Sequence, residues 1–198
     1  LKLQAFLSKK NPMSVMVVGI GNETLIADAF GALVSKNINV SKPHDQNPRH
    51  ITAIAPSVAG LTGIDSALVL DMFMDKIRPD LVIMADALLT RDPSRLLSNV
   101  QIADAPLAFG GADSRRSALR NLDRKIPVIS VGYSTTILSR SLSVKSKNID
   151  ATLSNNARFQ QSLCDNLILT PAECDHYVRR LAGAVSQSIN QALCLDPS

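Results

Sequence analysis

Asp80-Leu81-Val82-Ile83-Met84-Ala85-Asp86-Ala87-Leu88 is the stretch that decides the fold of this chain. Its five residues from Leu81 to Ala85 form an unbroken apolar run, as in strands that are buried on both faces of a parallel sheet. A carboxylate, Asp86, follows at the position where we expect the strand to end. In open α/β sheets, ligands and reacting groups collect at the carboxyl ends of strands. The stretch therefore predicts a parallel sheet and a candidate site residue at its edge, although an aspartate in this position can also simply cap the next turn.

The composition is that of one globular α/β domain. The chain has 198 residues, of which 45% are hydrophobic and 19% are charged, and we expect a single domain over residues 1–198. Aromatic residues make up only 4% and there is no Trp, so the core must be aliphatic and a base-stacking surface is not expected. The net charge of +4 comes from scattered Lys and Arg, which favours a solvated surface over direct nucleic-acid binding.

The cysteines indicate a reducing compartment. Cys164, Cys174 and Cys194 form neither an even disulfide set nor a metal-ligand spacing, so we expect reduced thiols in a cytoplasmic protein. No apolar run is long enough to span a bilayer and no secretory signal is evident, although the chain begins at Leu1 and an N-terminal segment can precede it. We expect no membrane partner, no bound metal and no cofactor.

Strand-like and helix-like patterns alternate along the chain. Further strands are predicted at Met13–Ile20, Ile51–Ala55, Val100–Ala103 and Pro127–Gly132, and helices at Ile26–Ile38, at Ile64–Ile77 and from Thr170 onward. Thr170 is the expected N-cap of the last helix, with Pro171 at its first position and Glu173 completing a capping box. This order predicts a three-layer α/β sandwich with a mostly parallel sheet.

A second carboxylate, Asp28, supports a functional role for Asp86. Asp28 lies in the first turn of the helix predicted from Ile26, where the helix dipole alone favours a carboxylate. If the strands that end near Ile20 and Asp86 are neighbours in the sheet, the two carboxylates face one crevice. Two carboxylates that share a site cannot both ionise freely, so one retains a proton while the other can activate water. The two aspartates are thus a candidate acid–base pair.

Five stretches of the chain resemble, in order, the motifs of one known family. They are Val-Gly-Ile-Gly-Asn at 18–22 followed by Asp-Ala-Phe-Gly at 28–31, Thr-Ala-Ile-Ala-Pro-Ser-Val-Ala-Gly-Leu-Thr-Gly-Ile-Asp at 52–65, Pro-Asp-Leu-Val-Ile-Met-Ala-Asp-Ala-Leu at 79–88 with Arg91, Val-Gln-Ile-Ala-Asp at 100–104, and Leu-Ile-Leu-Thr-Pro-Ala-Glu-Cys-Asp at 167–175. The family is the germination protease of spore-forming bacteria, which cleaves the small acid-soluble proteins that coat spore DNA. The similar stretches reach from Val18 to about Leu193.

The resemblance implies an atypical aspartic endopeptidase with the phosphorylase/hydrolase-like α/β fold that hydrogenase maturation proteases share. It implies a zymogen that is typically tetrameric, and a homo-oligomer in the cytoplasm, in the spore core, with small acid-soluble spore proteins as substrates. The two aspartates of the family fall on Asp28 and Asp86, each inside a similar motif. Further candidates to orient the pair or to bind substrate are Asn22, Thr62, Asp65 and Asp104, although polar side chains in turns commonly only satisfy backbone groups.

The chain also departs from the family pattern. Thr24-Leu25-Ile26-Ala27 replaces Asn-Val-Thr-Pro, Ser57 replaces a glycine, and the stretch from Ala105 to Arg116 has no His and fewer glycines. The chain is also shorter than family members. These differences leave two alternatives open. One is a family member that binds protein without cleaving it. The other is a metal-dependent peptidase of the maturation type, although His44, His50 and His176 are not paired at ligand spacing.

Overall fold

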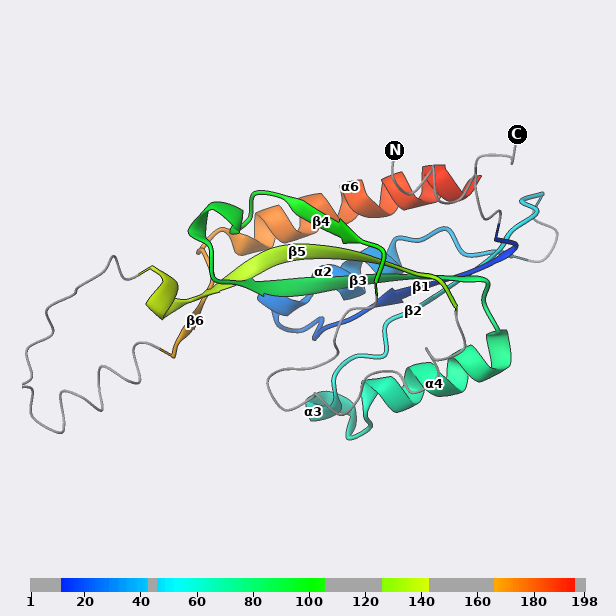
Figure 1. Cartoon of the computed structure of the whole chain (residues 1–198), viewed down its shortest axis with the longest axis horizontal. Helices are drawn as coiled ribbons and strands as arrows, with labels where there is room; N and C mark the ends of the chain where they lie inside the picture. Colours follow the sequence, from blue (N-terminus) through cyan, green and yellow to red (C-terminus); the bar gives the residue numbers. More distant parts are fainter. Residues whose placement is uncertain (1–11, 43–45, 106–125, 143–165, 195–198) are drawn as a thin grey trace, which may run out of the picture.

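The computed structural model describes residues 12–42, 46–105, 126–142 and 166–194 of the chain. Within these ranges the elements follow the order β1 (Ser14–Gly19), η1 (Ile26–Asp28), α2 (Phe30–Lys36), β2 (His50–Ile54), α3 (Ala59–Thr62), α4 (Ser66–Ile77), β3 (Leu81–Thr90), η2 (Pro93–Arg95), β4 (Val100–Ala103), β5 (Val128–Leu138), η4 (Ser139–Ser141), β6 (Ile168–Leu169) and α6 (Cys174–Cys194). Strands and helices alternate over the first half of the chain, as the sequence pattern predicts (Figure 1).

The sheet is mostly parallel, as predicted. Its strand order is β2-β1-β3-β5-β4, and β6 pairs with β5 next to β4. The strands β2, β1, β3 and β5 run parallel, while β4 and β6 are antiparallel to β5. The apolar run from Leu81 to Ala85 occupies the centre of this sheet, where each of its side chains is at most 1% exposed. The strand is therefore buried on both faces, as its unbroken apolar sequence indicates.

Helices cover both faces of the sheet and complete the three layers. Alternate residues of β3 point to opposite faces: Leu81 and Ile83 pack in the cluster that includes α2 and α6, and Val82 and Met84 pack in the cluster that includes α4. Figure 1 shows α6 on one side of the sheet and α4 on the other, and α2 packs in the cluster on the α6 side. Among the described residues, none of the helices has the length and apolar character needed to cross a lipid bilayer.

Three predicted boundaries are wrong. The strand predicted over Pro127–Gly132 continues to Leu138 as β5, because it stays paired with β3 and then also pairs with β6. The strand β3 does not end at Asp86 but runs to Thr90, because it remains paired with β5 after β1 has ended. The last helix begins at Cys174, later than the capping box predicts. The hydroxyl of Thr170 donates to the carbonyl oxygen of Thr135 at 2.9 Å, so a long-range hydrogen bond uses the group that was expected to cap the helix.

The helix predicted over Ile26–Ile38 is also divided. A 3-10 turn, η1, covers Ile26–Asp28, and α2 begins at Phe30 after Ala29. The break leaves Asp28 at the end of a short separate turn and not inside a helix. Asp28 still lies directly before Ala29, the N-cap of α2, so the dipole of α2 can favour a carboxylate there as well.

Candidate active site

Asp86 is the first residue of β3 beyond the end of β1. The last pair between these strands joins Gly19 to Ala85, and the N–H of Ile20 then donates to the carbonyl oxygen of Ala85 at 2.8 Å. On its other side Asp86 pairs with Gly132 of β5. The Asp86 carboxylate thus lies at the carboxyl end of β1, in the middle of the sheet, and this is the position where parallel sheets place their sites.

A tight turn brings Asp28 back to the same place. Gly21 has φ of +115°, and a Cβ on it would lie 2.0 Å from the carbonyl oxygen of Asp28, so only glycine fits this close approach. The backbone N–H of Asn22 donates to Oδ2 of Asp28 at 2.7 Å. The Gly-x-Gly pattern at 19–21 therefore lets the backbone turn off β1 and deliver an N–H group to the carboxylate.

The two carboxylates influence one another. Burial, together with the negative charge of Asp28, raises the pKa of Asp86 to about 7, and a hydrogen bond from the N–H of Ala87 opposes this rise. Burial also raises the pKa of Asp28, while the N–H of Asn22 opposes the rise. At near-neutral pH the pair can hold one proton and one negative charge, which is the state that acid–base chemistry requires.

Asn22 lies beside this pair, but its side chain serves its own turn. The Oδ1 atom of Asn22 accepts hydrogen bonds from the N–H of Thr24 at 2.9 Å and from the Thr24 hydroxyl at 2.7 Å. These bonds close the turn that presents the Asn22 backbone N–H to Asp28. The contribution of Asn22 to the site therefore comes from its backbone, and its side chain holds the backbone in place.

The structure does not bring the three other candidates to the carboxylate pair. The Thr62 hydroxyl bonds to the backbone of Val58 and Ile64 at 3.1–3.2 Å, and Asp65 caps α4 by accepting the N–H of Ala67 at 2.8 Å. Asp104 is exposed after β4. Because β4 is antiparallel to β5, it carries Asp104 toward the beginning of β5, away from the end of β1 where Asp86 lies. Within the described ranges, these three side chains make no hydrogen bond to Asp28 or Asp86.

A residue that we did not select from the sequence holds η1 in position. The hydroxyl of Thr135 donates to the carbonyl oxygen of Ala27 at 2.5 Å, and Thr135 is fully buried. The only signal in the sequence is a polar triplet, residues 134–136, directly after an apolar strand. In the structure this triplet lies inside β5, and the bond to Ala27 joins residues that are 108 positions apart.

A cavity of about 380 Å³ lies along β3 beyond Asp86. Its lining comes from β3, η2, β4 and β5 and consists of Leu88, Leu89, Thr90, Arg91, Asp92, Arg95, Gln101 and Ser134. Leu88 is two residues beyond Asp86 on the same face of β3, which corresponds to about 7 Å along a strand. The cavity is therefore within reach of a polypeptide whose backbone lies at the carboxylate pair.

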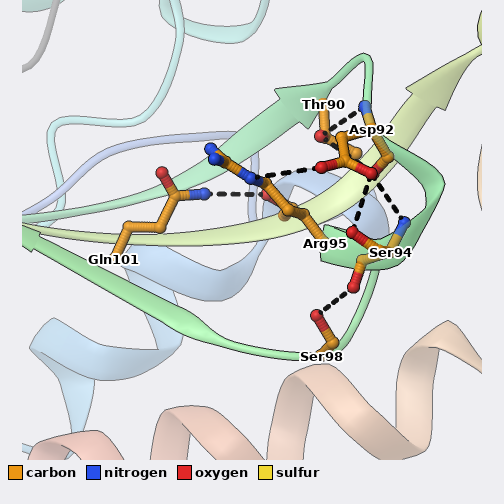
Figure 2. Close-up of polar contacts among 7 residues, drawn as sticks. Thr90, Asp92, Ser94, Arg95, Ser98 and Gln101 are labelled. Atoms are coloured by element: carbon orange, nitrogen blue, oxygen red, sulfur yellow. Dashed lines mark hydrogen bonds and ion pairs between the residues drawn. The ribbon is translucent and has the colours of Figure 1, made fainter.

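Polar contacts shape one wall of this cavity. Asp92 accepts hydrogen bonds from the N–H of Ser94 at 3.0 Å and from its hydroxyl at 2.7 Å, and it pairs with Nε of Arg95 at 3.5 Å. The bonds from Ser94 lower the pKa of Asp92. In Figure 2 the side chains of Arg95 and Gln101 extend toward one another over the sheet, and Gln101 donates to the hydroxyl of Ser134 at 3.2 Å.

The described residues contain no group of three or more His, Cys, Asp or Glu side chains that could hold a metal ion. His50 begins β2 and His176 lies edge-on to Tyr177 in α6. His44, Cys164 and the altered stretch beyond Ala105 lie outside the described residues.

Comparisons with known proteins define first the class of fold and then the family. The nickel–iron hydrogenase maturation protease HycI from Thermococcus kodakarensis superimposes with a TM-score of 0.57 at 18% sequence identity, over 98% of this chain and 99% of that one. This likeness confirms the predicted hydrogenase-maturation-protease-like α/β fold. A family model described as germination protease matches residues 2–162, so the chain belongs to the germination protease family.

Individual relatives agree with this membership. The germination protease of Caldanaerobacter subterraneus subsp. tengcongensis is 30% identical over 217 residues, which cover 93% of this chain and 67% of the relative. The germination protease of a Geobacillus species is 33% identical over 169 residues, which cover 79% of this chain and 45% of the relative. The chain thus spans about two thirds of the first relative and less than half of the second.

Proposed function

We propose that this chain is an endopeptidase in which Asp28 and Asp86 form the catalytic pair. The observation that supports the proposal best is the electrostatic coupling of the two carboxylates at the end of β1, with the pKa of Asp86 raised to about 7. A carboxylic acid that retains its proton at near-neutral pH can donate it to a leaving group. Membership of the germination protease family supports the same reaction class.

The two aspartates take different parts in this mechanism. Asp28 receives the N–H of Asn22, which stabilises its ionised form, so Asp28 accepts a proton from the attacking water. The oxygen of that water bonds to the scissile carbonyl carbon. Asp86 then gives its proton to the amide nitrogen as the C–N bond breaks. After the step Asp28 is protonated and Asp86 is ionised, and proton exchange with solvent restores the pair.

The proposed substrates are small acid-soluble spore proteins, as the family resemblance implies. Asp28 and Asp86 are largely buried but each keeps part of its surface accessible, so a bound polypeptide can contact the pair. A polypeptide bound at the pair can place a neighbouring side chain in the cavity between β3, η2 and β4. Synthesis as a zymogen, a homo-oligomeric state, typically tetrameric, and a cytoplasmic location in the spore core belong to the same proposal.

The test is cleavage of a purified small acid-soluble spore protein by the parent chain and by the variants Asp28→Asn and Asp86→Asn. Asp175→Asn is the matched control, because Asp175 is an exposed carboxylate on α6 that pairs with Arg179. We expect cutting by the parent and by the control, and loss of cutting in both site variants. Cutting by all four proteins would exclude the two-aspartate mechanism. Binding without cutting by a folded parent would favour the non-enzymatic alternative.

A further inference from the structure

The turn that carries Asp28 is attached to the sheet at two points. At the first, the carbonyl oxygen of Ala27 accepts the hydroxyl of Thr135 at 2.5 Å. At the second, the ring of Phe30 lies against the ring of Tyr133, with centroids 5.4 Å apart. Asp28 lies between these two contacts in the sequence. The position of its backbone relative to β5 is therefore fixed by residues 133 and 135.

Thr135 lies at a β-bulge and follows Tyr133 by two residues, so both side chains are on the face of β5 that packs against η1 and α2. Leu88 pairs with Ser134 and Leu89 pairs with Thr136, so Thr135 is the extra residue of β5 and has no partner on β3. An extra residue in a bulge is left out of the ladder, and bulges commonly redirect a side chain beside a site. The bulge lies two to three residues beyond Asp86 on β3. The bulge therefore lies close to Asp86, and its extra residue, Thr135, bonds to the segment that carries Asp28.

Thr135 is also held from its far side. Its carbonyl oxygen accepts the hydroxyl of Thr170 at 2.9 Å, so a chain of two hydrogen bonds runs from the segment before α6 through β5 to η1. Thr135 and Ala27 are both buried, at 0% and 8% exposure. Water therefore cannot readily replace the hydroxyl as the partner of the Ala27 carbonyl, and the bond is costly to lose.

We infer that Thr135 is a positioning residue, whose hydroxyl holds η1 so that the Asp28 carboxylate lies within electrostatic range of Asp86. The inference rests on the proposed function of that pair. Thr135 itself does not touch the reacting atoms. It acts by fixing the backbone one residue before Asp28, and loss of the bond lets η1 move away from β5 and take Asp28 with it.

The experiment compares Thr135→Val, which keeps the shape of the side chain but removes the donor, with Thr135→Ser, which keeps the donor. Thr136→Val is the matched control, because the Thr136 hydroxyl points to β3 and bonds to the carbonyl oxygen of Leu88 at 3.5 Å. The primary readout is the pKa of Asp86, measured by carboxyl NMR titration. This readout needs no substrate, so it decides the inference even if the chain proves to have no peptidase activity.

We expect Thr135→Val to lower the pKa of Asp86 by about half a unit or more, because a more distant Asp28 repels the ionised form less. Thr135→Ser and Thr136→Val should titrate like the parent. In the cleavage assay, Thr135→Val should lower kcat by about 10- to 100-fold with little change in KM, because misplaced catalytic groups affect the reaction more than binding. An unchanged Asp86 titration in folded Thr135→Val, or an equal change in Thr136→Val, would overturn the inference.

A second measurement uses the parent alone and covers the case in which Thr135→Val does not fold. A buried hydroxyl in a short hydrogen bond exchanges slowly with water. The hydroxyl proton of Thr135 should therefore give its own NMR resonance, with a cross-peak to the η1 backbone. A hydroxyl in rapid exchange, without contact to η1, would overturn the inference.

Discussion

The backbone of Gly31 lies directly against the carbonyl oxygen of Ala85, the residue before Asp86. A Cβ on Gly31 would lie 2.1 Å from that oxygen and 2.4 Å from the carbonyl oxygen of Ile20. Both contacts are backbone atoms that cannot turn aside. The helix α2 therefore packs on the sheet at a distance that only glycine permits, and this close packing places η1 and Asp28 over the end of β1.

Gly31→Ala should lower the free energy of unfolding by about 1–3 kcal/mol or more, because overpacking forces backbone shifts. Gly183→Ala is the matched control: Gly183 also lies in a helix, α6, but a Cβ there meets nothing within 4 Å. The control should be neutral or more stable by up to about 1 kcal/mol, since alanine favours a helix. Urea unfolding of the two variants measures both effects. Equal stability of the two variants would contradict the close packing at Gly31.

Peptidase activity should depend on pH as a bell-shaped curve. At low pH both carboxyl groups are protonated and neither can activate water. The acidic side of the curve therefore follows the pKa of Asp28, which burial raises above its ordinary value. Above about pH 7 Asp86 loses its proton, so the upper limb falls near that pH. Initial rates of cleavage between pH 4 and 9 measure the curve. A rate that keeps rising above pH 8 would contradict the role of Asp86 as the proton donor.

Asp86→Asn should stabilise the folded chain at alkaline pH while it abolishes cleavage. The raised pKa of Asp86 means that, from about pH 4 to 7, the folded state binds a proton that the unfolded state has lost, so the stability of the parent falls as the pH rises through this window. Asparagine cannot ionise and avoids this loss. At pH 8 the variant should be more stable than the parent by about 1–3 kcal/mol.

Urea unfolding of the parent and of Asp86→Asn at pH 4 and pH 8 measures this difference. At pH 4 the side chain at position 86 is uncharged in both folded proteins, as a protonated Asp86 in the parent and as an asparagine in the variant. The two proteins should therefore have similar stability at this pH. The same comparison with Asp175→Asn is the control, because Asp175 is exposed and pairs with Arg179. A stability gain that is equal at both pH values would show that the effect has a cause other than ionisation.

Arg91→Gln should raise KM for a protein substrate by several-fold and leave kcat nearly unchanged. Arg91 is an exposed cation that lines the cavity beyond Asp86, and the described residues give it no ion-pair partner. An exposed cation near a binding site contributes to binding more than to the chemical step. Arg179→Gln, on the exposed face of α6, is the control and should change neither constant. A fall in kcat alone would contradict a binding role for the cavity wall.

The sequence determined the fold class because its signals are local. An apolar run such as Leu81–Ala85 can be buried on both faces only inside a covered sheet, and alternating patterns of period two and 3.6 predict strands and helices without knowledge of their neighbours. The family motifs also pointed to Asp28 and Asp86. Local patterns could not predict the end of β3, since Asp86–Thr90 is held in a strand by pairing with β5. The capping-box pattern likewise did not reveal that Thr170 bonds to Thr135.

The tertiary structure alone decided which groups share the site. The pairing of β1 with β3 sets Asp28 near Asp86, and the face of β5 that carries Tyr133 also carries Thr135, which bonds to Ala27. The same structure uses Thr62 and Asp65 in local turns, and the antiparallel direction of β4 carries Asp104 away. These outcomes depend on contacts between segments that are far apart in the chain. Local patterns carry little information about such contacts, because strand order and register are set by the packing of the whole sheet.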